Sequence, residues 1–345
     1  MGGPLVFFSG GTALRDLAAE LAVQRVPSVH LITTFDSGGS SGVLRSTLRL
    51  PAVGDLRARL LSLAPASLPE RPLLERRLSD AGVGAARAEL RALLGRVEAP
   101  YGMAQHRWCC IRRLLISCAH RFPPETDLRN ACIGNLVLAE RCLRGGSLAA
   151  AVDFFGRFIG AFGAVRPVTE ACADLRVRLA NGVEIVGQHR FTGKFFSPIE
   201  SPIRHISLTV PASAPLCVLD DILNAGIICY PVGSFYSSLL AALLPSGIRW
   251  ALEKLTVPRV FMPNPLPDPE LCGQTLLEQV DVLRGHAPVT HLLADPDDRR
   301  YPGGVPELAL KDRGIIPVRL PILRGNGRLN PCAVIDALTR LRDGS

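Results

Sequence analysis

The first 35 residues contain the pattern that most constrains the fold. Residues 5–8 are a short apolar run, followed by the turn Ser9-Gly10-Gly11-Thr12 and by apolar side chains at helical spacing over residues 14–22. Pro27 ends this predicted helix, and residues 29–34 form a second run rich in β-branched side chains. Strand, glycine turn, helix and strand make a βαβ unit, which has parallel strands and a right-handed crossover. The chain is therefore expected to build an open α/β sheet.

The rest of the chain extends this sheet and adds two excursions. Residues 65–125 carry Leu, Ala and Arg at helical spacing between prolines, which predicts a helical insertion. The Asn181-Gly182 turn between two β-rich runs is typical of a hairpin, so residues 175–210 are predicted to form a small antiparallel β excursion. From residue 225 the βαβ pattern returns. We predict a Rossmann-like, doubly wound, mainly parallel sheet in a single α/β nucleotide-binding domain over residues 1–345.

Composition excludes several classes of protein. Of the 39 basic residues only three are lysines, and the arginines are scattered instead of forming a basic block, so no nucleic-acid partner is expected. Residues 222–248 carry no charge, but Pro231, Gly233 and Pro245 interrupt them, so no membrane span is expected. Ten cysteines without a CxxC pair, behind a start that lacks signal-peptide character, indicate reduced thiols in a cytoplasmic protein.

Three loops that follow predicted strands carry residue types that bind phosphate, and in an open α/β sheet ligands lie at the carboxyl ends of the strands. The most specific loop is residues 33–42, where Ser37-Gly38-Gly39-Ser40-Ser41 follows Asp36. Its N–H groups and hydroxyls would form an anion nest beside a carboxylate that can bind a metal. Residues 9–12 and 230–238 are the other two loops. The alternative interpretations are a packing turn at 9–12 and a flexible loop at 33–42.

Three further positions are candidates for the same site. Asp55 stands at a predicted helix start, where a helix N-cap and a ligand contact fit the sequence equally well. Asn135 begins another predicted helix, and Asn264 follows another strand end. Neither the histidines nor the cysteines have the spacing of a zinc site.

Taken in order, these segments resemble the superfamily of 2-phospho-L-lactate transferases and gluconeogenesis factors (CofD/YvcK-like). The Gly38–Gly42 run is more similar to the YvcK-like branch than to the archaeal transferases. The motifs that carry the resemblance are Gly10-Gly11-Thr12, Asp36 with Gly38-Gly39-Ser40-Ser41-Gly42 and Leu44-Arg45, Gly54-Asp55-Leu56-Arg57, Gly134-Asn135-Leu136, Gly233-Ser234-Phe235-Tyr236-Ser237-Ser238, and Asn264.

The resemblance implies a Mg²⁺-dependent transferase. Such an enzyme moves a phospholactyl or phosphoenolpyruvyl group from a GDP-linked donor to an alcohol acceptor and releases GMP. The YvcK-like branch implies the alternative, a non-catalytic UDP-sugar-binding regulator of carbon metabolism or cell-wall synthesis. The family often has two adjacent carboxylates where this chain has Asp36-Ser37, and that departure weakens the case for a metal centre. A third hypothesis, an NAD-dependent oxidoreductase with Asp36 on the ribose, lacks the glycine fingerprint.

The resemblance also implies roles for single residues. Asp36 is assigned to Mg²⁺, and Asp55 to Mg²⁺ or to the base, so both are the catalytic candidates. Arg45 and Arg57 are expected to contact phosphate. The partner is a nucleotide diphosphate, either a GDP-linked donor or a UDP-sugar, and a homodimer is compatible with the sequence. The candidate ligand-binding residues are Gly10, Gly11, Thr12, Ser37, Gly38, Gly39, Ser40, Ser41, Arg45, Arg57, Asn135, Gly233, Ser234 and Asn264.

Overall fold

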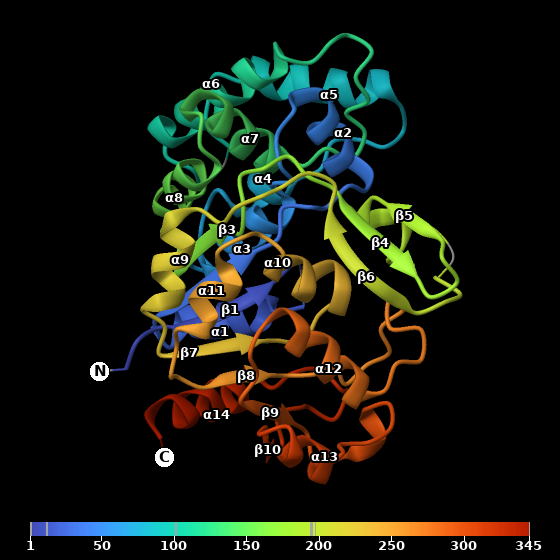
Figure 1. The fold of residues 1–345 in the computed structure, drawn as a ribbon. Helices are drawn as coiled ribbons and strands as arrows, with labels where there is room; N and C mark the ends of the chain where they lie inside the picture. The colour runs from blue at the N-terminus through green and yellow to red at the C-terminus, as the bar shows by residue number, and fades with distance from the viewer. Residues whose placement is uncertain (1, 12, 101, 194–195, 197, 345) are drawn as a thin grey trace.

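The computed structural model describes residues 2–11, 13–100, 102–193, 196 and 198–344. Within these residues, a sheet of seven parallel strands has the order β10-β9-β8-β7-β1-β2-β3 (Figure 1). The mainly parallel α/β fold predicted from the sequence is confirmed. The strands are β1 (Leu5–Ser9), β2 (Ser28–Ile32), β3 (Ala164–Pro167), β7 (Ile227–Tyr230), β8 (Arg259–Phe261), β9 (His291–Ala294) and β10 (Ile316–Arg319).

The interior strand β1 is buried on both faces, which is why residues 5–8 form an unbroken apolar run. Successive side chains of a strand point to opposite faces. Leu5 and Phe7 pack with α1 (Arg15–Val23) and α14 (Pro331–Asp343) on one face. Val6 and Phe8 pack on the other face with α9 (Leu216–Leu223), α11 (Ile248–Glu253) and α12 (Leu276–His286). Helices on both faces make the sheet doubly wound.

A large helical layer lies between β2 and β3 and forms the upper part of the molecule in Figure 1. Its core surrounds the fully buried Trp108, and Glu140 ties two of its helices by accepting hydrogen bonds from Arg121 at 2.6 Å and from Ser117. The segment 65–125, expected to be helical, supplies three of these helices, α4 to α6. The layer consists of α2 (Gly39–Leu48), α3 (Gly54–Leu63), α4 (Arg71–Glu75), α5 (Val83–Gly95), α6 (Gln105–Ala119), α7 (Ile133–Gly145) and α8 (Leu148–Ile159).

The antiparallel excursion forms as predicted, with strand order β5-β4-β6. Its strands are β4 (Leu175–Leu179), β5 (Glu184–Val186) and β6 (Ile203–Leu208). Strand β5 ends at Val186, because Gly187 takes a φ of +98° and turns the chain into the 3₁₀ helix η1 (Gln188–Arg190). This bend carries residues 188 and 189 toward the main sheet's loops.

The loop after β2 and the helices after β7 differ in detail from the pattern expected from the sequence. The expected 33–42 loop is shorter, because Gly39 already begins α2, with Gly38 in extended conformation as its N-cap. Within the loop 230–238 a π-helix begins, η2 (Phe235–Leu240), which is followed by α10 (Ala241–Leu243). The uncharged stretch 222–248 therefore contains β7, a short turn and these two helices. No helix within the described ranges is both long and apolar enough to cross a membrane. The remaining helices are η3 (Asp298–Arg300) and α13 (Glu307–Asp312).

Close packing of α4 against α7 leads to the first prediction. A Cβ at Gly134 would lie 2.5 Å from the Leu74 carbonyl oxygen and 2.6 Å from Arg57 Cδ. Gly134→Ala must therefore push the two helices apart, and we expect the free energy of unfolding in a urea titration to fall by about 1–3 kcal/mol. The matched control is Gly84→Ala in α5, where a Cβ meets no atom within 4 Å, so its stability should stay equal or rise. Equal losses in both variants would contradict the packing argument.

Candidate functional site

A cavity of about 330 Å³ opens at the carboxyl ends of β1, β2 and β7. From β1 the sheet continues to β2 and β3 on one side and to β7 on the other, so this is its topological switch point. We call it the switch-point cavity. The predicted site residues that line it are Gly10, Gly11, Asp36, Gly38, Gly39, Ser40, Ser41, Asp55, Gly233 and Ser234. Thr12 lies outside the described residues.

Asp55 reaches the turn after β1 from the first turn of α3. The N-cap of α3 is Val53, so the N-cap interpretation of Asp55 is wrong. Instead, Gly11 N–H donates to Asp55 Oδ2 at 2.7 Å. A Cβ at Gly11 would lie 3.3 Å from Asp55 Oδ1, and one at Gly10 would lie 2.6 Å from Ser238 Oγ. The backbone at the two glycines is thus approached closely from both sides, which leaves little room for a side chain at either position.

Arg59, which the sequence analysis missed, supports the same turn from inside the protein. Its side chain is buried, and its guanidinium donates to the carbonyl oxygens of Leu14 at 2.7 Å and Gly10 at 3.3 Å. Burial lowers the pKa of Arg59 to about 10, and the charge of Asp55 acts in the opposite direction. Arg59 is therefore charged at neutral pH. Its position one helical turn after Asp55 places both side chains on the same face of α3, and that spacing is the signal available in the sequence.

The second loop presents a carboxylate and a helix N-terminus to the cavity. Asp36 Oδ1 accepts a hydrogen bond of 3.2 Å from Gly38 N–H, which closes the turn before α2. The first-turn residues of α2, at positions 39 to 41, line the cavity. A helix N-terminus carries a partial positive charge and N–H groups that favour anions. This loop therefore places an anion-binding element beside a carboxylate.

Ser37 faces the antiparallel excursion and is not one of the residues that line the cavity. Its Oγ is 2.8 Å from His189 Nδ1, and the His189 N–H donates to the same oxygen at 3.4 Å. Gln188, the neighbour of His189, does line the cavity. The excursion is thus attached to the second loop at Ser37.

The third loop differs from the second because its helix N-terminus is already occupied. Asp268 Oδ2 accepts from Phe235 N–H at 2.8 Å, and Glu270 Oε2 accepts from the N–H groups of Tyr236 and Ser237 at 3.0 and 2.8 Å. These amides of η2 therefore cannot bind a ligand phosphate at the same time. Ser234 and Ser238 remain on the cavity wall.

Four other predicted residues lie outside the switch-point cavity. Arg45 donates to Asp174 Oδ1 at 2.7 Å and to the Ala173 carbonyl oxygen at 2.6 Å. Arg57 Nε donates to Asn135 Oδ1 at 2.7 Å, and burial lowers the pKa of Arg57. These three side chains join segments of the protein to one another. Asn264 Nδ2 donates to the Gly233 carbonyl oxygen at 3.0 Å, and Asn264 lines a second cavity.

Among the described residues, the cation that lines the switch-point cavity is Arg77, an exposed residue of the helical layer. Its Nη1 donates to the Asn130 carbonyl oxygen at 3.0 Å. Nothing in the sequence near residue 77 resembles a ligand-binding motif, so the sequence analysis did not single it out. Its place in the cavity results from the fold of the helical layer.

The donor set fits a magnesium ion that arrives with a phosphorylated ligand. Among the described residues, no three His, Cys, Asp or Glu side chains come together as a metal site. Asp36 and Asp55 both line the cavity. Mg²⁺ is often held by one or two carboxylates, with ligand phosphates and water completing its shell. These two residues would hold it.

The doubly wound sheet and the glycine-rich cavity at its switch point define an α/β protein with a small-molecule site at the carboxyl ends of its strands. A family model described as 2-phospho-L-lactate transferase CofD matches residues 5–298, so the chain belongs to this family. The resemblance drawn from the motifs is confirmed.

Curated relatives and a solved structure agree with this assignment. The putative gluconeogenesis factor of Thermotoga maritima is 26% identical over 281 residues, 81% of this chain and 74% of that protein. The gluconeogenesis factor of Bacillus subtilis is also 26% identical and covers 82% of this chain and 74% of its own length. A crystal structure of a UPF0052-family protein from Bacillus halodurans has a TM-score of 0.77 at 22% identity and covers 98% of this chain and 99% of that one. That last likeness concerns the fold.

The buried Glu270 predicts an unusual dependence of stability on pH. Burial, and secondarily the charge of Asp268, raise its pKa from 4.5 to about 7. A carboxyl whose pKa is raised by folding stabilises the native state fully below pH 4.5, and this contribution is lost as the pH rises through about 7. We expect Glu270→Gln to flatten the decline in the free energy of unfolding between pH 5 and 8, a difference of about 2 kcal/mol.

Urea titrations at a series of pH values measure this slope. Glu307→Gln, at an exposed carboxylate of α13, is the control and should keep the wild-type slope. If Glu270→Gln also kept the wild-type slope, Glu270 would have an ordinary pKa in the folded protein.

Proposed function

We propose that this chain is a 2-phospho-L-lactate transferase-like enzyme. It binds a GDP-linked donor and transfers the phospholactyl or phosphoenolpyruvyl group to an alcohol acceptor, with release of GMP. The observation that carries the proposal is the pair of carboxylates, Asp36 and Asp55, which line one cavity together with the glycine turn after β1 and the N-terminus of α2. Phosphoryl transfer depends mainly on positioning and on neutralising charge, and these are what such a cavity supplies.

The residues of the cavity have different roles, which follow from their positions. The first turn of α2 holds the diphosphate through N–H groups and hydroxyls, and the glycine turn, whose Gly11 N–H is bound to Asp55, lets the phosphate approach the backbone closely. Arg77 contributes a positive charge at the cavity wall. Asp36 holds Mg²⁺, and Asp55, oriented by the Gly11 N–H, either shares the ion or accepts the proton of the acceptor. When bound, Mg²⁺ supplies neutralisation of the phosphate charge.

The transfer itself breaks one bond and forms one bond. The acceptor's hydroxyl oxygen attacks the distal phosphorus of the diphosphate, and the bond from this phosphorus to the bridging oxygen breaks. GMP leaves with the bridging oxygen, and the hydroxyl proton passes to the base, for which Asp55 is the candidate. The chain itself forms no covalent intermediate.

A second candidate function is a non-catalytic regulator that binds a UDP-sugar. It is favoured by Ser37, which stands where the family often has a second carboxylate and is hydrogen-bonded to His189 instead of lining the cavity. The names of the curated relatives, which are gluconeogenesis factors, support the same alternative.

Thermal unfolding with GDP, UDP-N-acetylglucosamine and NAD, each with and without Mg²⁺, separates the candidates, because a ligand bound only by the native state raises the melting temperature. A shift with GDP that requires Mg²⁺ supports the transferase. A shift with the UDP-sugar that is indifferent to Mg²⁺ supports the regulator. A shift with NAD alone would contradict both.

The two carboxylates can be tested one at a time. Asp36→Asn and Asp55→Asn remove charge while preserving shape, so each should abolish the Mg²⁺-dependent part of the GDP shift. In a single-turnover assay for GMP release, we expect a loss of about 100-fold or more, from lost charge neutralisation with Asp36→Asn and from lost charge neutralisation or base catalysis with Asp55→Asn. Asp312→Asn, an exposed residue at the end of α13, is the control and should behave as wild type. Wild-type behaviour of both test variants would remove these residues from the mechanism.

A further inference from the structure

The helices α5 and α6 of the helical layer take no part in the site described above. Among the described residues, neither helix supplies a side chain to the lining of the switch-point cavity. A groove of about 260 Å³ lies between residues 87–94 of α5 and residues 116–120 at the end of α6. We call it the α5–α6 groove. It is a feature of the insertion for which the proposed function has no use.

The floor of the α5–α6 groove is apolar and recessed. It is formed by Leu90 and Leu94 of α5, by Ile116 of α6 and by Leu128. Leu90 and Leu128 are only 4% and 1% exposed, and Leu94 and Ile116 are half-buried. Small-molecule sites usually measure about 300–1,000 Å³, so this groove is below that range. The aliphatic side chains of a docked helix need less room, because each enters the groove singly.

The shape of this floor is fixed by the protein itself. Arg87, which lines the groove, donates to the Thr126 carbonyl oxygen at 3.1 Å. That hydrogen bond attaches α5 to the segment that carries Leu128, two residues further along the chain. The groove is therefore already formed before anything binds, and a preformed site loses less free energy on binding.

Arginines at the rim of the groove have charges that the protein does not use. Arg91 lines the groove and is exposed. Arg113 is also exposed and lies one helical turn before Ile116, on the same face of α6. Over the part of the chain that the structure describes, neither guanidinium has a hydrogen-bond or ion-pair partner. The apolar floor is thus bordered by free positive charge on both helices.

The surrounding sequence adds to this charge. Residues 83–122, which contain both helices, carry seven arginines and two glutamates, a formal charge of +5 out of +8 for the whole chain. One of the two glutamates, Glu89, accepts hydrogen bonds from Arg76 Nε at 3.0 Å and from the Ser79 N–H at 2.7 Å. More than half of the net charge of the protein therefore lies on this helix pair.

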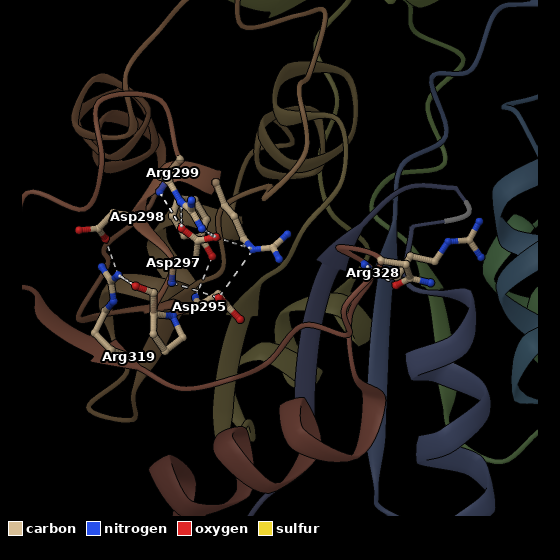
Figure 2. A network of polar contacts seen from close by, with 10 residues as sticks. Asp295, Asp297, Asp298, Arg299, Arg319 and Arg328 are labelled. Carbon is tan, nitrogen blue, oxygen red and sulfur yellow. Dashed lines mark hydrogen bonds and ion pairs between the residues drawn. The ribbon is translucent and has the colours of Figure 1, made fainter.

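The loop after β9 shows the opposite arrangement. Figure 2 shows its arginines beside carboxylates: Arg299 Nε donates to Asp297 Oδ1 at 2.8 Å, and Arg319 pairs with Asp298. The described lining of the α5–α6 groove contains no aspartate or glutamate. An acidic partner would supply the carboxylates that the groove lacks.

We propose that the α5–α6 groove binds an acidic amphipathic helix of a partner protein. Aliphatic side chains of that helix, spaced three and four residues apart, pack on Leu90, Leu94 and Ile116. Glutamates or aspartates beside them pair with Arg91 and Arg113. Recognition of this kind combines an apolar centre with a charged rim that selects the partner. It does not depend on which ligand the switch-point cavity binds.

Three other occupants fit the groove less well. A membrane surface is contacted by apolar side chains that protrude, whereas Leu90 and Leu128 are buried. Single-stranded RNA stacks its bases on aromatic side chains, and the described lining contains no Phe, Tyr or Trp. A second copy of the chain, paired through the same face by two-fold symmetry, would bring like charges together.

Fluorescence anisotropy with a labelled acidic peptide tests the proposal on the full chain. The peptide has about 15 residues, the length at which isolated helices become marginally stable, with leucines at helical spacing and flanking glutamates. We expect saturable binding that weakens as salt is added. The double variant Arg91→Glu, Arg113→Glu should weaken it about tenfold or more. Both arginines are exposed and unpaired among the described residues, so these changes should not disturb folding.

Two further variants separate the floor from the rim and from net charge. Leu94→Gln makes the floor polar and should also weaken the acidic peptide. Arg324→Glu changes charge at an exposed residue in the turn before α14, at the end of the molecule opposite the helical layer (Figure 1), and should bind like wild type. A peptide with lysine in place of each glutamate should not bind.

Several results would overturn the proposal. It is wrong if the acidic peptide does not bind, if the lysine peptide binds equally well, or if the double variant binds like wild type. Phosphatidylglycerol vesicles and oligouridine are tested alongside. Tighter binding of either one, lost in the double variant, would make the groove a membrane or RNA site instead. Sedimentation would reveal a dimer of wild type that the double variant dissociates, and a second copy would then be the occupant.

Discussion

The buried guanidinium of Arg59 is the interaction on which the geometry of the site depends. The carbonyl oxygens of the turn after β1 and of the helix start that follows it are bound from the protein interior. Arg59 binds the carbonyl oxygens of Gly10 and Leu14, while Asp55 receives the Gly11 N–H. One face of α3 therefore fixes the turn after β1. A glycine turn without such support would lose much of its preorganisation, since glycine has the largest conformational freedom to lose.

The two helix N-termini at the site differ in whether their amides are free to bind an anion. The amides at the start of η2 are bound by Asp268 and Glu270, although the preceding glycine-serine sequence is typical of a phosphate loop. At the start of α2, Asp36 binds a single amide, that of Gly38. Two loops of similar composition thus differ in electrostatic character, because acidic side chains near residue 270, distant in sequence from α2, neutralise only one of them.

The mainly parallel sheet and much of the cavity lining were predictable, because short apolar strands followed by glycine turns define both the sheet and the loops at its carboxyl edge. The partners of the arginine side chains were not predictable. Arg45 and Arg57 lie within recognisable motifs, yet they bind Asp174 and Asn135, and a charge pattern does not reveal which partner is nearer in space. Arg77 and Gln188 reach the cavity from segments whose positions depend on the packing of the helical layer and of the antiparallel excursion. Periodicity carries no information about that packing.

The pairing of β1 with β7 has a consequence for how the chain folds. Leu5 lies opposite Ile227, so β1 meets one of its two neighbours only after the chain between these two residues has been made. Until then β1 presents an unpaired edge, and such edges are sites of aggregation. Closing a parallel pair over this distance along the chain is slow compared with local helix formation. A ligand that contacts the turns after both strands binds only the closed sheet, so its concentration in the cell would favour the completed fold over an incompletely paired sheet.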